Sequence, residues 1–274
     1  MRIVVFILLL LSAMGVGAET VRIPAGTLVL RGEYFPPQGQ THVLAPAVLL
    51  LHGCNGLYDK AGELVPRYER MKDLLQEMGY GVLLLDSYGR RGVRRDCPKS
   101  ARKGPRVSAG IRANDAQHAL SWLNARRELD GNRLGVLGWS HGATAALTLM
   151  GRADPGARAA VAFFPQCQSL NSKRDYRVAA PTLLLLGEAD RQAPLAACRK
   201  LGELTRQDLF HIVSYPGGRH DFDQSKAAAE THGEAQAGEA GQDAYRRTFK
   251  WFSRWFDPAR GISGIPPRDP ISSK

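Results

Sequence analysis

Residues 132–150 predict a buried strand, a sharp turn and a helix in immediate succession, which strongly constrains the fold. Residues 132–138 (NRLGVLG) form a short apolar run, and residues 143–150 (ATAALTLM) are rich in Ala and Leu. Between them, GWSHG at 138–142 fits the pattern G-x-S-x-G. A serine on such a turn has a strained backbone and an exposed hydroxyl, and the flanking glycines allow close packing. Ser140 is therefore a candidate nucleophile, although a five-residue pattern also occurs by chance.

Short apolar runs alternate with segments of helical periodicity along the rest of the chain. This alternation predicts an α/β fold with a mostly parallel central sheet and helices on both faces. In such sheets the functional site lies beyond the carboxyl ends of the strands. Strands are expected at 47–51, 81–85, 132–138, 159–164, 182–186 and 209–214, with one or two antiparallel edge strands in 21–35, and helices at 63–78, 108–129, 195–205 and 243–256.

The N-terminus predicts an export signal. Arg2 is a short basic region, residues 3–11 are apolar, and residues 16–18 are small, as a signal peptide over residues 1–18 requires. The alternative is an uncleaved membrane anchor, but the apolar run is short for a bilayer. We expect a periplasmic or secreted protein with no stable membrane insertion after cleavage.

The remaining chain suits a single domain over residues 19–260 with a loose tail, rich in Pro and Ser, over 261–274. Residues 224–241 are rich in Ala, Glu and Gly and are expected to form a mobile insertion. The net charge of +11 fits anionic substrates or surfaces, and because no nucleic-acid motif accompanies it, nucleic acid is not an expected partner. The four cysteines form no C-x-x-C, so no metal site is expected; in an oxidising compartment they suggest two disulfides.

A serine nucleophile needs a base to take its proton and an acid to orient that base. In a strand-turn-helix enzyme these follow in the order serine, acid, histidine. Asp190 stands in a turn after the strand at 182–186 and is the candidate acid. Glu188 is the competitor, because it lies two residues closer to the strand, and a capping role is the alternative for Asp190.

The candidate base is His220, on a glycine-led loop (YPGGRH) after the last expected strand. Such a loop can carry the imidazole over the edge of the sheet, in the correct order after Ser140 and Asp190. The other histidines considered lie in helices, strands or loops without a comparable motif, namely His42, His52, His118, His141 and His211.

Stabilising an oxyanion requires two donors beside the serine. The backbone N–H of His141, at the start of a helix, is the first candidate. The second comes from the loop HGCNG at 52–56, where Cys54 or Asn55 would supply the N–H.

Six motifs together resemble the dienelactone hydrolase family of the α/β-hydrolase fold: HGCNGL, LLLDSYGRRG, GWSHG, FFPQC, LLGEADRQAP and YPGGRHDFD. The resemblance covers nearly the whole exported chain. It implies Ser140 as nucleophile, Asp190 as acid and His220 as base, with oxyanion donors near Cys54 and His141.

One departure separates the chain from the enzymes that give this family its name. Those enzymes use a cysteine where Ser140 stands, and they carry a glutamate where Gly53 stands. The chain is therefore more similar to a secreted, serine-type branch, and dienelactone cleavage itself is not the favoured reaction.

The resemblance also bears on the cysteines. In this fold the strands that precede Cys54 and Cys97 are neighbours, and Cys167 and Cys198 likewise lie just beyond two neighbouring strands. We therefore expect the disulfides Cys54–Cys97 and Cys167–Cys198, each beside the site; four free buried thiols are the alternative.

The residues predict a serine hydrolase that cleaves a carboxylic ester or lactone through an acyl-enzyme, with no metal or organic cofactor. A peptidase using the same triad, and a non-catalytic envelope binding protein on a hydrolase scaffold, are the alternatives. A loop at 90–106 is either a solvated segment or an electropositive wall that favours anionic esters. Its basic residues are Arg90, Arg91, Arg94, Arg95, Lys99, Arg102, Lys103 and Arg106.

Overall fold

The computed structural model describes residues 18–39, 43–97, 106–173, 175–224 and 234–257. The expected signal peptide and C-terminal tail therefore lie outside the described residues, apart from Ala18 itself. His42 and the basic residues Lys99, Arg102 and Lys103 also lie outside them.

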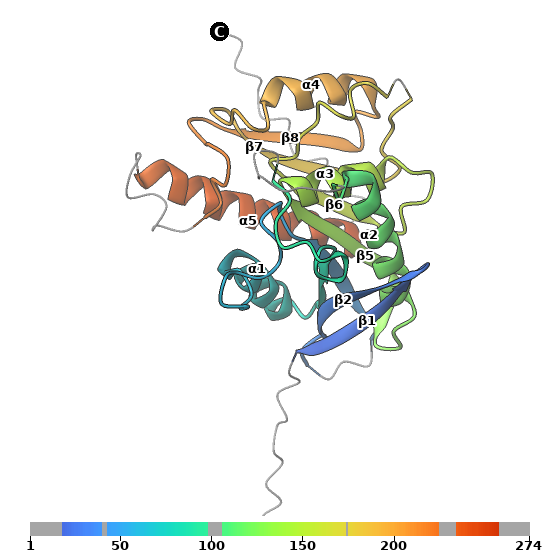
Figure 1. Ribbon diagram of the computed structural model, residues 1–274. Helices are drawn as coiled ribbons and strands as arrows, with labels where there is room; N and C mark the ends of the chain where they lie inside the picture. The colour runs from blue at the N-terminus through green and yellow to red at the C-terminus, as the bar shows by residue number, and fades with distance from the viewer. Residues whose placement is uncertain (1–17, 40–42, 98–105, 174, 225–233, 258–274) are drawn as a thin grey trace, which may run out of the picture.

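An eight-stranded mixed sheet forms the centre of the protein, in the order β1-β2-β4-β3-β5-β6-β7-β8 (Figure 1). β1 and β2 are antiparallel to their neighbours, and all pairings from β4 to β8 are parallel. The predicted α/β class and mostly parallel sheet are therefore confirmed. The strands are β1 (Glu19–Ala25), β2 (Leu28–Phe35), β3 (Ala45–Leu51), β4 (Gly81–Asp86), β5 (Leu129–Trp139), β6 (Ala159–Phe163), β7 (Thr182–Gly187) and β8 (Phe210–Tyr215).

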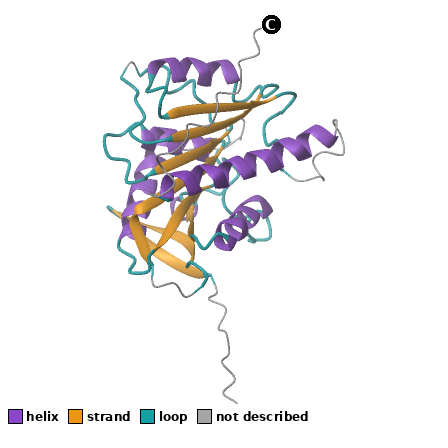
Figure 2. Cartoon of the chain, turned by 180° about the vertical axis from the view of Figure 1, so that it is seen from behind, coloured by secondary structure: helices purple, strands orange, loops and turns teal. Residues whose placement is uncertain are grey.

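Helices cover both faces of the sheet. One face carries α1 (Pro66–Glu77) and the long α5 (Glu234–Phe256), which crosses the strands and extends past the sheet (Figure 2). The other face carries α2 (Ala109–Asn124), α3 (His141–Met150) and α4 (Leu195–Leu204), and a 3-10 turn, η1 (Gly89–Arg91), follows β4.

The central strands are buried on both faces, as continuous apolar runs require. In β3, Leu49 and Leu51 pack under α2 and α3, whereas Val48 and Leu50 pack under α1 and α5. Burying both faces fixes the register of the parallel strands and aligns their carboxyl ends at one edge. No helix within the described ranges is both long enough and apolar enough to cross a membrane.

The prediction of a mobile insertion over residues 224–241 is wrong for its last part. Helix α5 begins at Glu234, well before the expected start at residue 243. A Cβ on Gly241 would lie 3.2 Å from the Cα of Asp223, so this glycine lets the helix pack closely on the loop after β8. The Ala and Glu content that suggested disorder is equally typical of a helix.

Candidate active site

Ser140 lies on the turn between β5 and α3, at the carboxyl end of a central strand. Its backbone has φ 50° and ψ −114°, and positive φ is unfavourable for residues other than glycine. Only two other non-glycine residues in the described ranges have positive φ, Phe164 and Asp221. Phe164 contacts the ring of His220, and Asp221 directly follows His220 in sequence. All three non-glycine residues with positive φ in the described ranges therefore lie at this site.

Close backbone contacts demand the two glycines that flank Ser140. A Cβ on Gly138 would overlap the backbone of Gly142. A Cβ on Gly142 would lie 2.5 Å from the carbonyl oxygen of His52 and would overlap that of Leu51. Helix α3 therefore packs directly on the end of β3, and the G-x-S-x-G spacing follows from this contact.

Ser140, His220 and Asp190 form one hydrogen-bonded chain. Nε2 of His220 lies 3.0 Å from Oγ of Ser140, and Nδ1 of His220 lies 2.7 Å from Oδ2 of Asp190. With the proton on Nδ1, His220 donates to Asp190 and accepts from the Ser140 hydroxyl. The three residues follow β5, β7 and β8, so the shared edge of the sheet brings them together.

Asp190 is held as an anion. Its Oδ1 accepts the backbone N–H groups of Gln192 at 2.7 Å and Ala193 at 3.0 Å. Burial alone would raise the pKa of Asp190, but the hydrogen bonds from His220 and these N–H groups outweigh burial and lower it. Glu188, the competing acid, instead accepts the hydroxyl of Ser214 at 2.7 Å and lies outside the chain.

A buried ionic network fixes the loop that carries His220. Nη2 of Arg67, on α1, lies 2.9 Å from Asp221 and 3.1 Å from Asp223. Asp223 also accepts the indole N–H of Trp139 at 2.9 Å. Sequence analysis did not single out Arg67 or Asp223, although Asp223 ends the motif YPGGRHDFD.

Within the described ranges, no acceptor is seen for the backbone N–H groups of Cys54 and Asn55, on the loop after β3, or for that of His141, next to Ser140. His141 is the first residue of α3, where N–H groups lack intrahelical partners. The neighbouring N–H of Gly53 is already used, because it donates to the hydroxyl of Tyr68 at 2.8 Å.

The rings of His52 and His141 are not placed to act as bases on Ser140. Nδ1 of His141 lies 2.9 Å from the hydroxyl of Tyr88, and burial together with the charge of Arg112 lowers the pKa of His141 to about 4. His141 is therefore neutral at pH 7, and its Nδ1 is engaged with the Tyr88 hydroxyl. Burial also lowers the pKa of His52, whose ring packs 4.5 Å from that of Tyr88. Nδ1 of His52 lies 2.7 Å from the carbonyl oxygen of Gly53, and its Nε2 has no hydrogen-bond partner in the described structure.

His211 and His118 are not part of the hydrogen-bonded chain of Ser140, His220 and Asp190. His211 is part of β8, and its ring packs 5.1 Å from that of Trp251. His118 lies in the middle of α2.

Both expected disulfides are present. Cys54–Cys97 joins the loop after β3 to the loop after β4, and Cys167–Cys198 joins the segment after β6 to α4. The N–H of Asp96 also donates to the carbonyl of Cys54 at 2.8 Å, so the Cys54 loop is fixed twice.

The basic loop after β4 is partly neutralised. Arg91 forms two hydrogen bonds of 2.8 Å with Asp115, and Arg106 lies 2.5 Å from Asp96. Arg94 donates to the backbone carbonyl of Asp59. Arg91, Arg94 and Arg106 therefore help to hold the described part of the loop in place.

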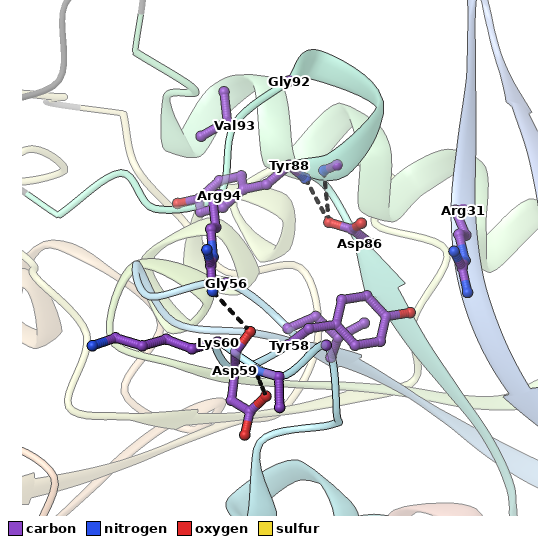
Figure 3. Close-up of a pocket in the computed structure, with 14 residues that line it drawn as sticks. Arg31, Gly56, Tyr58, Asp59, Lys60, Asp86, Tyr88, Gly92, Val93 and Arg94 are labelled. Carbon is purple, nitrogen blue, oxygen red and sulfur yellow. Dashed lines mark hydrogen bonds between the residues drawn. The ribbon is translucent and has the colours of Figure 1, made fainter.

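Two cavities open at this edge of the sheet. One, of about 680 Å³, lies beside Asp190 and His220 and is also lined by Arg191 and Arg219. The other, of about 520 Å³, lies between the loops after β3 and β4, and Figure 3 shows Tyr58 and other residues lining it. Neither arginine of the first cavity forms an ion pair within the described chain. No group of three His, Cys, Asp or Glu side chains in the described residues is arranged to hold a metal ion.

The parallel core, with a serine on the turn after its central strand, defines a hydrolase of the α/β-hydrolase fold. The chain belongs to the dienelactone hydrolase family, whose profile matches residues 32–256. YtaP of Bacillus subtilis (strain 168), which is named as a hydrolase, is 32% identical over 119 residues. That match covers 40% of this chain and 40% of YtaP, so it spans less than half of the curated relative.

Solved structures share the fold. A dienelactone hydrolase from Anabaena variabilis ATCC 29413 is 20% identical, with a TM-score of 0.62 over 88% of this chain and 99% of that chain. A dienelactone hydrolase-like promiscuous phosphotriesterase from metagenomic libraries, P91, is also 20% identical, with a TM-score of 0.69 over 88% and 99%. At this identity the likeness establishes the architecture, and the chemistry has to be argued from the site.

Proposed function

We propose that the protein is a serine hydrolase that cleaves a carboxylic ester or lactone through an acyl-enzyme. The hydrogen-bonded chain of Ser140, His220 and Asp190 carries this proposal, because its distances suit proton transfer at both ends of the imidazole. The strained backbone of Ser140 and its place at a helix N-terminus support the same role.

In the first step, Oγ of Ser140 attacks the substrate carbonyl while Nε2 of His220 takes the hydroxyl proton. Asp190 holds the Nδ1–H of His220 and stabilises the imidazolium that forms. His220 then gives its proton to the leaving alkoxide, and an acyl-enzyme remains. A water molecule, deprotonated by the same histidine, releases the acid and restores Ser140.

The negative oxygen of the tetrahedral intermediate needs donors that are otherwise unused. We assign the N–H groups of Cys54 and His141 to this role, with Asn55 as the alternative to Cys54, because the N–H of Gly53 is occupied by Tyr68. The N-terminus of α3 adds a favourable dipole at His141.

The residue at position 53 favours ester hydrolysis over the reaction that names the family. A Cβ on Gly53 would lie 3.8 Å from Cβ of Ser140, so a glutamate there would face the nucleophile. With glycine, no side chain at this position acts on Ser140, and the serine depends on His220 alone for activation.

The substrate class we favour carries an anionic group. Arg191 and Arg219 line the cavity beside His220, where a leaving group departs. Their charges are offset there only by Glu188, since Asp190 is paired with His220. An anionic ester should therefore react with a larger kcat/KM than a matched neutral ester, and added salt should reduce the difference. Equal, salt-insensitive values would contradict this preference.

We also propose that the chain works in the periplasm or outside the cell. Two disulfides support this location, because they persist in oxidising compartments and are rare in the cytosol. N-terminal sequencing of exported protein should begin after Ala18.

A panel of ester, lactone and peptide substrates tests the proposal, run with wild-type protein and the Ser140→Ala variant. We expect turnover of an activated short-chain p-nitrophenyl ester, with a loss of at least about 1,000-fold in kcat for the variant. Turnover of peptides alone would indicate a peptidase. A fluorophosphonate probe that fails to label Ser140, together with no turnover, would indicate a binding protein.

A further inference from the structure

Arg112 places a positive charge inside the protein, under the candidate site. It lies in the first turn of α2, and its side chain is fully buried. Arginine is rarely buried completely unless a carboxylate pairs with it, because desolvating its charge is costly. A charge kept in such a place needs a specific reason.

No carboxylate pairs with Arg112 in the described part of the chain. The two carboxylates that act electrostatically on Arg112 are committed elsewhere: Asp115 binds Arg91, and Asp86 accepts the N–H groups of Tyr88 and Gly89. Nε and Nη1 of Arg112 have no hydrogen-bond partner within the described residues. Its Cζ lies 5.1 Å from the ring centroid of Tyr88, so the guanidinium is held against an aromatic face.

Arg112 forms a hydrogen bond with a backbone carbonyl at the site. Nη2 donates to the carbonyl oxygen of His52 at 2.6 Å. His52 precedes Gly53 and Cys54, and the same carbonyl oxygen lies 2.5 Å from the position of a Cβ on Gly142. This carbonyl therefore lies between the loop of Cys54 and the start of α3 at His141, which carry the proposed oxyanion donors.

A carbonyl oxygen in this position acts against an oxyanion. Its partial negative charge lies beside the start of α3 and reduces the positive potential that the helix offers. A guanidinium bound to that oxygen opposes the effect and fixes the orientation of the peptide that leads to Cys54. Because the charge is buried and already in place, it costs no reorganisation when the oxyanion forms.

We propose that Arg112 is a positioning residue for oxyanion stabilisation: its guanidinium holds the His52 carbonyl and supplies positive charge between the segments of Cys54 and His141. The inference rests on the ester hydrolysis proposed above. Arg112 acts through the backbone and its field and does not touch the substrate.

The electrostatics of His141 support this assignment. After burial, the charge of Arg112 is the largest cause that lowers the pKa of His141 to about 4. The field of the guanidinium therefore reaches the residue whose N–H is one of the two donors. The charge of Arg112 also lowers the pKa of His52, and only burial lowers it more.

Two variants separate charge from shape. Arg112→Met keeps much of the side-chain length and removes the charge, whereas Arg112→Lys keeps the charge and loses the planar fork. Active sites are counted with a fluorophosphonate, and kcat for an activated ester is expressed per titrated site. We expect kcat of the Met variant to fall by roughly 10- to 100-fold, less than the loss from deleting a donor itself, with KM changed by less than about twofold. The Lys variant should recover part of this loss.

A spectroscopic measurement reports the charge directly. The pKa of His141, followed by NMR, should rise in Arg112→Met and stay closer to wild type in Arg112→Lys. Tyr176→Phe is the matched control, since it removes a buried donor to the Leu147 carbonyl of α3 without altering charge. Its kcat per site and the pKa of His141 should equal those of the wild type.

Unchanged kcat per site in Arg112→Met, or equal losses in the Met and Lys variants, overturns the proposal. Loss of titratable sites in both variants assigns Arg112 to folding and also overturns it. If wild-type protein neither turns over esters nor reacts with the fluorophosphonate, the proposed function fails, and this inference falls with it. Ester turnover that is lost in Ser140→Ala but insensitive to Arg112 overturns the inference alone.

Discussion

The indole N–H of Trp139 donates to the carboxylate of Asp223 at 2.9 Å, which ties the residue before Ser140 to the loop that carries His220. Arg67 reaches the same carboxylate from α1, at 3.1 Å. The turn that carries Ser140, the loop that carries His220 and helix α1 are thus held by one buried carboxylate. The distance between Ser140 and His220 depends on this anchor as well as on the sheet.

Replacing Asp223 should damage both stability and activity. Asp223→Ala leaves the Arg67 guanidinium without its most buried partner and the Trp139 indole without an acceptor, at a cost of about 3–5 kcal/mol in the free energy of unfolding. Asp223→Asn keeps an acceptor for the indole and should lose less. Urea denaturation and kcat per titrated site measure the two effects. An Ala variant as stable as the wild type would show that the anchor is dispensable.

The contact between α3 and β3 predicts a severe effect at Gly142. A methyl group there meets the carbonyl oxygens of Leu51 and His52, so Gly142→Ala must separate the segments of the two proposed oxyanion donors. We expect kcat/KM to fall by at least about 100-fold. Gly110→Ala is the control, because its Cβ would meet only Oγ of Ser108, at 3.7 Å. That variant should keep its activity and gain up to about 1 kcal/mol in stability. Equal activities of the two variants would argue against this account.

Sequence predicted the parts of the site that follow from local pattern. The apolar runs located the parallel strands, and the G-x-S-x-G pattern marked the turn at Ser140, where a Cβ on Gly138 would meet the backbone of Gly142 four residues on. Asp190 and His220 were found because parallel strands align their carboxyl ends at one edge. The pairing of the four cysteines came from the family resemblance, which implies which strands of the fold are neighbours.

The residues that support the site could not be found in this way. Arg67 and Asp223 are 156 positions apart along the numbering, and only the packing of α1 against the loop after β8 brings them together. Arg112 left a weak local signal, since it shares a helix face with Ala116 and Ala119, which are buried. A charge on an apolar face can equally mark a helix end, so its partner, the carbonyl of His52 just after β3, was needed to interpret it.

The two disulfides should differ in their effect on catalysis. Each should stabilise the fold by about 2–4 kcal/mol, but only Cys54–Cys97 fixes the loop with a proposed oxyanion donor. We expect Cys54→Ser/Cys97→Ser to lose more kcat per titrated site than Cys167→Ser/Cys198→Ser at matched folded fractions. Alkylation of denatured protein should find no thiols before reduction and four after it. Thiols that react before reduction would contradict both bridges.

Acid should destabilise the protein through its buried histidines. The pKa of His141 is lowered from an ordinary 6.5 to about 4, so between these values the unfolded chain binds a proton that the folded protein excludes. Stability therefore falls as the pH drops from about 6.5 towards 4, by up to about 3 kcal/mol from this residue. His52, whose pKa is also lowered, contributes with the same sign. The lowered pKa of Asp190 also reduces stability in acid, but mainly below this window, because the unfolded carboxyl takes up its proton near its ordinary pKa of 3.8.

Urea denaturation at a series of pH values measures this dependence, with His141→Asn as the comparison. The variant cannot take up a proton at position 141, so its free energy of unfolding should decline less steeply between pH 6.5 and 4. The slope that remains belongs to His52 and the other titrating groups. Parallel curves for the two proteins would mean that His141 is protonated as easily in the folded protein as in the unfolded chain.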